Sequence, residues 1–248
     1  MENTKKIYFA SDAHLGFPSY EKSLVREKKF VLWLDEIKND ASEIFLLGDI
    51  FDFWYEYKRV VPRGYTRLLG KISEITDSGI PVHFFTGNHD IWVFDYLPTE
   101  TGVIIHREKF IIERNGKTFL LAHGDGLGPG DKSFKLMKKF FTSPIAQKCF
   151  SLIHPNLALK FGLSWSHRRR HFHQYEDFLG QDKEWLVIYS KEKLKTRHYD
   201  YFIYGHRHIP MVFDITENSK YINLGDWIGN FTYGVFDGKD FELKKFDS

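Results

Sequence analysis

Short apolar segments recur along the chain, and each of them ends in a group of polar residues. The six segments lie at 6–14, 43–52, 82–90, 117–125, 200–208 and 221–227. Continuous apolar runs of this length, bounded by Gly and Asp, are typical of strands buried on both faces. The pattern predicts buried strands, each followed by polar residues that do not belong to the apolar core.

Helical periodicity separates the first three of these segments. Residues 23–40 and 66–79 place apolar side chains at helical spacing, and the second stretch ends at Gly79, a suitable helix C-terminus. The apolar positions are Leu24, Val31, Leu34 and Ile37 in the first stretch and Leu68, Ile72 and Ile75 in the second. Alternation of strands and helices predicts an α/β sandwich.

The alternation breaks at about residue 130. Residues 131–175 indicate two or three short helices inserted before the strand near Phe202. From Met211 onward the pattern predicts antiparallel strands, with turns at 216–220 and 237–240. We find no internal repeat and no low-complexity linker. We therefore expect one domain over residues 1–248, with a helical lid inserted at 130–180.

Composition limits the class of protein. The 248 residues are 42% hydrophobic and 17% aromatic, which excludes a disordered chain, and the net charge of +2 says little by itself. The single cysteine, Cys149, excludes an intrachain disulfide and fits a reducing compartment. The first apolar run is too short for a signal peptide, and no apolar run reaches membrane-spanning length. We expect a cytoplasmic protein.

Five of the six segments end in side chains that can bind a metal. These are Asp12 and His14, Asp49 and Asp52, Asn88 with His89 and Asp90, His123 and Asp125, and His206 and His208. Two residues that are two positions apart on an extended chain point to the same face, so each Asp-x-His or His-x-His pair can address one point. Ligands of α/β sheets bind beyond the carboxyl ends of the strands.

Each motif alone has a structural explanation, such as a turn or a surface loop. The set of five does not, because so many buried carboxylates and imidazoles would carry a large desolvation cost without a cation. Oxygen and nitrogen ligands without thiolate favour Mn, Fe, Zn or Mg. These candidate ligands are too many for one ion. They predict two divalent ions about 3.5–4 Å apart, able to polarise a phosphate and activate water.

The ordered motifs Asp-x-His, Gly-Asp-x-x-Asp, Gly-Asn-His-Asp, His-Gly-Asp and Gly-His-x-His resemble those of the calcineurin-like metallophosphoesterases. The resemblance implies a four-layer αββα sandwich with two metal ions, of which we expect Mn first and Fe, Zn or Mg as alternatives. It implies these ligands: Asp12, His14, Asp49 and His208 for one ion and, with Asp49 shared, Asn88, His123 and His206 for the other. His89 then contacts or protonates the substrate, and Asp90 orients the His89 ring.

The predicted insertion is strongly basic and also apolar. Its cations are Lys132, Lys135, Lys138, Lys139, Lys148, Lys160, Arg168, Arg169 and Arg170, against Asp131. One interpretation is an ordinary helical subdomain with a basic solvated face. The other is a lid for an amphiphile, in which cations meet an anionic head group and apolar side chains meet acyl chains.

The sequences of residues 48–54 and 123–131 resemble those of the UDP-2,3-diacylglucosamine hydrolases of lipid A biosynthesis, and so does a helical insertion directly after the second of them. The resemblance implies attack of water on the pyrophosphate of UDP-2,3-diacylglucosamine, giving UMP and 2,3-diacylglucosamine 1-phosphate (lipid X). It implies peripheral association with the cytoplasmic face of the inner membrane. The implied head-group contacts are Asp131, Ser166, Arg168, Arg169 and Arg170. The best-described branch of that family has arginine at the position of His89.

Two other functions fit parts of the sequence. A soluble phosphodiesterase or nucleotide pyrophosphatase would use the same metal site without a lipid. A protein-binding scaffold of this fold would lack metal ligands, and all seven are present here. A nucleic-acid partner is not expected, because the basic residues gather in one insertion.

Activity is expected to fall in acid, as ligand histidines take up protons and metal leaves.

Overall fold

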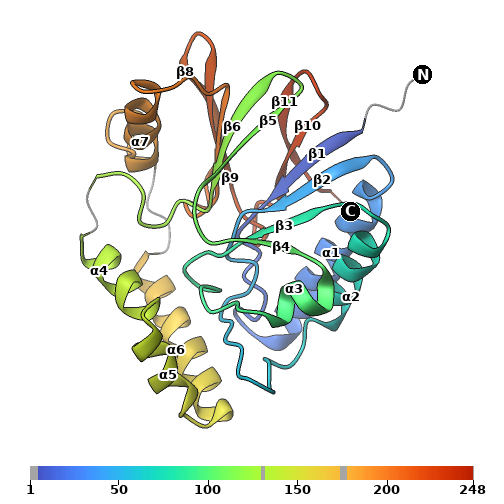
Figure 1. The fold of residues 1–248 in the computed structure, drawn as a ribbon, viewed down its shortest axis with the longest axis vertical. Coiled ribbons are helices and arrows are strands. Elements are labelled where there is room, and N and C mark those ends of the chain that lie inside the picture. The colour runs from blue at the N-terminus through green and yellow to red at the C-terminus, as the bar shows by residue number, and fades with distance from the viewer. Residues whose placement is uncertain (1–4, 130–131, 174–177, 248) are drawn as a thin grey trace.

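Two β-sheets packed face to face form the centre of the molecule (Figure 1). The computed structural model describes residues 5–129, 132–173 and 178–247, without the side chains of residues 132–134 and 167–173. Within this part of the chain, one sheet has six strands in the order β11-β10-β1-β2-β3-β4. The other has five, in the order β5-β6-β7-β9-β8.

The six predicted strands are all present. The first sheet contains β1 (Lys6–Ala10), β2 (Ala41–Leu46), β3 (Val82–Phe85), β4 (Ile104–His106), β10 (Thr232–Phe236) and β11 (Phe241–Lys245). The second contains β5 (Phe110–Arg114), β6 (Lys117–Ala122), β7 (Tyr201–Tyr204), β8 (Pro210–Thr216) and β9 (Ser219–Leu224). The short strand β4 and the half-buried strand β5 were not predicted. The expected antiparallel pairs are β8 with β9 and β10 with β11.

Parallel pairing brings the functional ends of the strands together. In the first sheet β1, β2, β3 and β4 pair in parallel, and in the second sheet β6, β7 and β9 do so. Phe9 and Phe45 stack between the sheets at 5.3 Å, and Phe119 packs beside them. The alternate residues Tyr8 and Ala10 face the helices instead. The strands are therefore buried on both faces, as their apolar runs predict.

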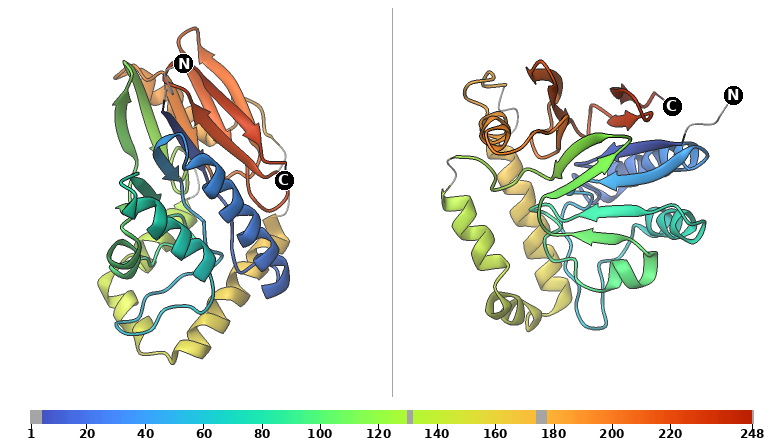
Figure 2. Two further views of the ribbon diagram at one scale, coloured as in Figure 1. Left: turned by 90° about the vertical axis from the view of Figure 1, so that its right-hand side faces the viewer. Right: turned by 45° about the horizontal axis from the view of Figure 1, so that its top comes forward.

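Helices cover the outer face of each sheet, which completes the predicted αββα sandwich (Figure 2). The first sheet carries α1 (Tyr20–Ile37), α2 (Thr66–Asp77) and α3 (Tyr96–Thr101), and the second carries α7 (Trp185–Leu194). The predicted face of α2 is the buried one, and Gly79 follows it at φ 88°. The buried face of α1 is centred on Phe30 and Trp33, while Leu24 and Val31 are only half-buried.

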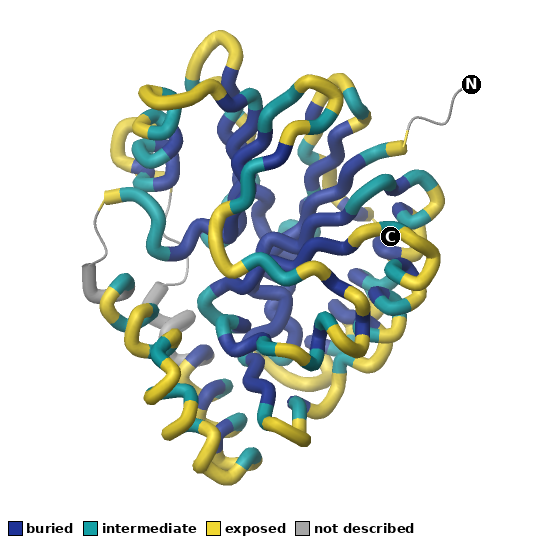
Figure 3. The backbone as a smooth tube through the Cα atoms, in the orientation of Figure 1, coloured by how far each residue is buried: buried dark blue, intermediate teal, exposed yellow. Residues whose placement is uncertain are grey.

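Three helices occupy the predicted insertion: α4 (Lys132–Phe141), α5 (Pro144–Ser151) and α6 (Pro155–His173). They lie together outside the two sheets, and most of their outward turns are exposed (Figures 1 and 3). Ala158, Gly162 and Ser166 recur every four residues and form the buried stripe of α6. A Cβ at Gly162 would overlap the Phe53 ring, so α6 packs closely on the loop after β2.

Hydrogen bonds from aromatic side chains of the core hold the insertion. Trp92 Nε1 donates to the carbonyl of Phe141 at 2.8 Å, and the Tyr55 hydroxyl donates to the carbonyl of Gln147 at 2.9 Å. The insertion is thus attached beside the polar ends of the strands. Its action as a lid stays a prediction. In the part of the chain described, none of the helices combines the length and apolar character needed to cross a membrane.

Candidate metal centre

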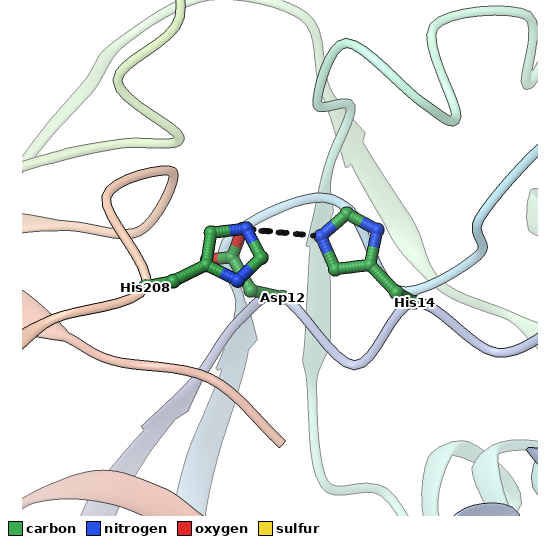
Figure 4. A group of neighbouring side chains, drawn as sticks. All are labelled: Asp12, His14 and His208. Carbon is green, nitrogen blue, oxygen red and sulfur yellow. Dashed lines mark hydrogen bonds and ion pairs between the residues drawn. The ribbon is translucent and has the colours of Figure 1, made fainter. Parts of the chain in front are cut away.

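The loops after β1 and β7 bring three predicted ligands to one point (Figure 4). Nε2 of His14 lies 3.2 Å from Nε2 of His208, and the latter lies 3.3 Å from Oδ1 of Asp12. Nε2 of His14 also lies 3.6 Å from Oδ1 of Asp12. Side chains from positions 12 and 208 of the sequence therefore share one site.

A second group lies beside the first, and its carboxylate, that of Asp49, lies close to the first group as well. Asp49, His123 and His206 bring their ligand atoms within 4.8 Å of one another. Oδ2 of Asp49 is 3.3 Å from Nε2 of His123 and 3.6 Å from Nε2 of His14. Its other oxygen, Oδ1, accepts from the backbone N–H of His89 at 2.8 Å. Asp49 therefore lies between the two groups with one oxygen directed at both.

The backbone is strained where these side chains are presented. Five of the predicted ligands adopt positive φ, between 42° and 67°: Asp12, His14, Asp49, His206 and His208. Non-glycine residues rarely adopt this region, and they gather at functional sites when they do. Gly87 allows the loops to meet, because a Cβ there would overlap the Asp49 carboxylate. Tertiary contacts thus impose a geometry that local preference opposes.

Unpaired polar atoms indicate that this cluster is built for cations. In the part of the chain described, Oδ1 of Asn88 is buried without a hydrogen-bond partner. Oδ1 of Asp12 and Nε2 of His123 are also buried, and their closest polar neighbours are other groups of the cluster at 3.3 Å. Such atoms are costly unless something binds them. Ligands at about 2.1 Å from one ion lie about 3.0–3.4 Å apart, close to the separations seen here. The donor set of carboxylate, amide oxygen and imidazole suits a hard or borderline divalent ion.

The charges of the cluster are poorly balanced without a cation. Burial raises the pKa of Asp12. Burial also acts to raise the pKa of Asp49, but the imidazoles of His123 and His89 hold it well below its usual value. Burial acts to lower the pKa of His123, yet the Asp49 carboxylate raises it to about 10. A divalent cation bound here would supply the positive charge that these shifts otherwise draw from protons.

His89 faces the same cluster without belonging to either predicted ligand set. Its Nε2 lies 3.9 Å from Oδ2 of Asp49, and His14, Asp49 and His89 form a third group close enough to hold an ion. Its Nδ1 lies 2.9 Å from the carbonyl of Asp52 and 3.1 Å from Oγ of Ser166. The Ser166 hydroxyl donates to Oδ2 of Asp52 at 2.8 Å. Helix α6 therefore contacts the ring of His89 directly.

Asp90 does not orient the His89 ring, contrary to the expectation from sequence. Its carboxylate accepts from the backbone N–H of Gly87 at 2.7 Å and of Ile50 at 2.8 Å, and none of its hydrogen bonds in the described residues goes to His89. Asp90 instead joins the loop after β3 to the loop after β2. Burial, with the nearby Asp49, raises the pKa of Asp90 to about 7. The carbonyl of Asp52 and the Ser166 hydroxyl hold the ring.

Of the predicted head-group residues, only Ser166 can be placed in full. It is buried on α6, beside His89. Asp131 and the side chains of Arg168, Arg169 and Arg170 lie outside the described residues. Another insertion residue, Lys138 on α4, pairs with the buried Asp125 of the His-Gly-Asp motif.

Two carboxylates beside the predicted ligands belong to neither predicted ligand set. Oδ1 of Asp52 lies 3.5 Å from Nδ1 of His14, and Oδ2 of Asp226 lies 3.5 Å from Nδ1 of His208. Asp52 belongs to the Gly-Asp-x-x-Asp motif. Asp226 lies near the end of the sixth apolar segment, the one without a predicted ligand, and the dipeptide Gly-Asp is its only signal in the sequence.

Comparison with known proteins agrees with this geometry. A protein of Porphyromonas gingivalis named UDP-2,3-diacylglucosamine hydrolase is 38% identical, over 98% of this chain and 98% of its own. Proteins of the same name from Shewanella piezotolerans and Photorhabdus laumondii are 23% and 26% identical, over 90% and 88% of this chain and 90% of their own. Residues 5–210 match the calcineurin-like phosphoesterase family. The chain belongs to this family and is a metal-dependent hydrolase.

Proposed function

We propose that the protein hydrolyses the pyrophosphate bond of UDP-2,3-diacylglucosamine, releasing UMP and 2,3-diacylglucosamine 1-phosphate. The observation that carries this proposal is the direct contact between the candidate metal centre and an apolar, basic insertion, through Ser166 and His89. The name shared by the relatives, one of them 38% identical over nearly the full length, supports the same substrate.

The metals would be held by seven side chains. Asp12, His14 and His208 form one group, and His123 and His206 form the other with Asp49, which also lies near His14. We infer that Asn88 completes the second group. Bound divalent ions, which we propose are Mn²⁺, would polarise the phosphoryl oxygens and activate water. The unpaired Oδ1 of Asn88 supports its place in the second group.

The hydrogen bonds of His89 support a role in proton transfer. The Ser166 hydroxyl has one hydrogen, which it donates to Asp52, so its oxygen can only accept from Nδ1 of His89. The Asp52 carbonyl is also an acceptor. Nδ1 therefore carries a proton, and Nε2 is the nitrogen that faces the cluster. From there a protonated Nε2 would donate to a phosphoryl oxygen or to the departing group.

The surface of the insertion fits an amphiphilic substrate. Leu136, Phe140, Ile145, Leu152, Leu157 and Phe161 are between 59% and 81% exposed. Lys139, Lys148 and Lys160 are exposed on the same helices. Apolar side chains among cations suit acyl chains attached to an anionic head group. The same surface would give peripheral association with the anionic inner face of a membrane.

A product assay tests the proposal. Mn-loaded protein is given UDP-2,3-diacylglucosamine in detergent, beside UDP-N-acetylglucosamine and bis-p-nitrophenyl phosphate, and the products are identified by mass spectrometry. We expect UMP and the lipid monophosphate from the first substrate, with little product from the others and none from Asp49→Ala. Cleavage of the soluble substrates alone would reject the lipid substrate and favour a soluble phosphodiesterase.

A further inference from the structure

The loop after β9 places a carboxylate next to His208, on the side of its ring that faces away from the other predicted ligands. Oδ2 of Asp226 lies 3.5 Å from Nδ1 of His208, whose other nitrogen, Nε2, lies 3.3 Å from Oδ1 of Asp12. Asp226 is only 8% exposed. The ring of His208 therefore lies between Asp226 on one side and the ligand cluster on the other.

Donors in the same loop fix the direction of this carboxylate. Oδ1 of Asp226 accepts from the backbone N–H of Ile228 and Gly229, both at 2.9 Å, and of Asn230 at 3.1 Å. Nδ2 of Asn230 donates to Oδ2 of Asp226 at 3.2 Å and to the carbonyl of His208 at 3.0 Å. With Oδ1 occupied by three donors, Oδ2 is the oxygen turned toward the ring.

A carboxylate opposite one ring nitrogen determines the tautomer of a neutral imidazole. Oδ2 of Asp226 can only accept, so Nδ1 of His208 must carry the proton. The lone pair then resides on Nε2, which faces the cluster. Partners of this kind orient metal-binding histidines and raise their affinity for the ion. Asp226 has the position and the polarity for that task.

We propose that Asp226 is a positioning residue, which holds His208 with Nε2 available to a divalent cation. This inference rests on the proposed function, in which His208 is a ligand. With this role the sixth apolar segment also contributes to the site. The ends of the other five segments supply the predicted ligands and their neighbours, and Asp226 contacts the nitrogen of His208 that faces away from the cluster. Trp227, the next residue, adds a bond from its N–H to the carbonyl of Asp12 at 3.1 Å.

Asp226→Asn separates this role from simple turn formation. The three backbone donors would keep the amide oxygen at the Oδ1 position, so the amide NH₂ would replace Oδ2 and direct a donor at Nδ1. His208 would then favour the tautomer with the proton on Nε2. In that tautomer Nε2 has no lone pair to offer to a metal ion in the cluster. The matched control is Asp237→Asn in the turn between β10 and β11. There Oδ1 of Asp237 accepts from the N–H of Lys239 at 2.9 Å and of Asp240 at 2.8 Å.

The test is calorimetric titration of metal-free wild type and both variants with Mn²⁺. We expect two ions in the wild type and in Asp237→Asn, and an affinity about tenfold or more weaker for one ion in Asp226→Asn. Unchanged affinities in Asp226→Asn would overturn the inference and leave the proposed function standing. A wild type that binds no Mn²⁺ would overturn both.

The tautomer of His208 gives a readout that does not depend on the stability of the variant. In the wild type loaded with Zn²⁺, which is diamagnetic and replaces any proton shared with Asp12, ¹⁵N NMR of the imidazoles at pH 8 should show His208 with its proton on Nδ1. A proton on Nε2 would contradict the role of Asp226, whatever the titration gives.

Discussion

Oγ of Ser166 on α6 lies 3.1 Å from Nδ1 of His89 in the loop after β3. The two residues are 77 positions apart in the sequence. Through this contact a residue of the insertion helps to set the tautomer and orientation of the ring that faces the predicted metal ligands. The insertion therefore contacts the candidate site, and we expect its position to affect proton transfer as well as substrate binding.

Replacement of His89 tests proton transfer. His89→Gln removes the ring but keeps an amide of similar reach, so we expect kcat to fall by about 100-fold or more. Metal content, measured by mass spectrometry of the elements, should stay at the wild-type level, because the seven predicted ligands remain. Parallel losses of turnover and metal would instead make His89 a ligand, as the group formed by His14, Asp49 and His89 allows.

Ser166→Ala tests the contact between α6 and His89. Loss of the hydroxyl leaves Asp52 and His89 with one partner fewer, and we expect kcat to fall by about tenfold, the cost of one hydrogen bond to a charged group. Ser164→Ala, at an exposed position of the same helix, is the matched control and should behave as wild type. Equal activity of the two variants would rule out the positioning role of Ser166.

Exposed apolar residues of the insertion should govern attachment to membranes. Ile145→Glu with Leu152→Glu places charges at positions that are 77% and 81% exposed, so the fold should tolerate them. We expect co-sedimentation with anionic lipid vesicles to fall several-fold, since each change removes about 1 kcal/mol or more of apolar transfer energy. Val25→Glu with Leu32→Glu, at positions of α1 that are 70% and 56% exposed, adds the same two charges and should bind like wild type. A similar loss in this control would assign the effect to net charge.

A histidine pair between β3 and β4, with His83 buried and His106 half-buried, should make the fold sensitive to acid. Nδ1 of His83 lies 2.9 Å from Nε2 of His106. Burial lowers the pKa of each to about 4, with a further contribution from Arg114 at His83 and from His83 at His106. The unfolded chain takes up protons near pH 6.5 and the folded chain only near pH 4, so stability is full above pH 6.5 and is lost as pH falls.

Between pH 7 and pH 4 we expect the free energy of unfolding to fall by about 2 kcal/mol. This is less than the two pKa shifts would give together, because the pair is partly solvated. Urea unfolding at several pH values measures it. The double variant His83→Phe with His106→Phe should lose less stability in acid than wild type, which separates this pair from the metal-binding histidines. His198→Gln, at an exposed position, should follow the wild-type curve. Identical slopes for all three proteins would show that the pair has no such effect.

Local patterns in the sequence were sufficient for most elements of this fold. Apolar runs bounded by Gly and Asp predicted the six strands that end near or beside the site, because burial on both faces leaves an unmistakable run. The short strand β4 and the partly exposed strand β5 leave no such run, and both were missed. The buried face of α1 was predicted only in part, because large aromatic side chains at Phe30 and Trp33 decided which side packs inward.

The sequence by itself determined which residue types stand at the strand ends, and the order of five motifs was enough to identify the family. It could not determine which polar groups meet across the fold. Ser166 reaches Asp52 over 114 positions, and Asp90 bonds the backbone of another loop instead of its neighbour His89. Asp226 likewise gains its place behind His208 only when β7 and β9 pair. Hydrogen bonds depend on distances of about 3 Å and on direction, and only the packing of both sheets and the insertion sets these.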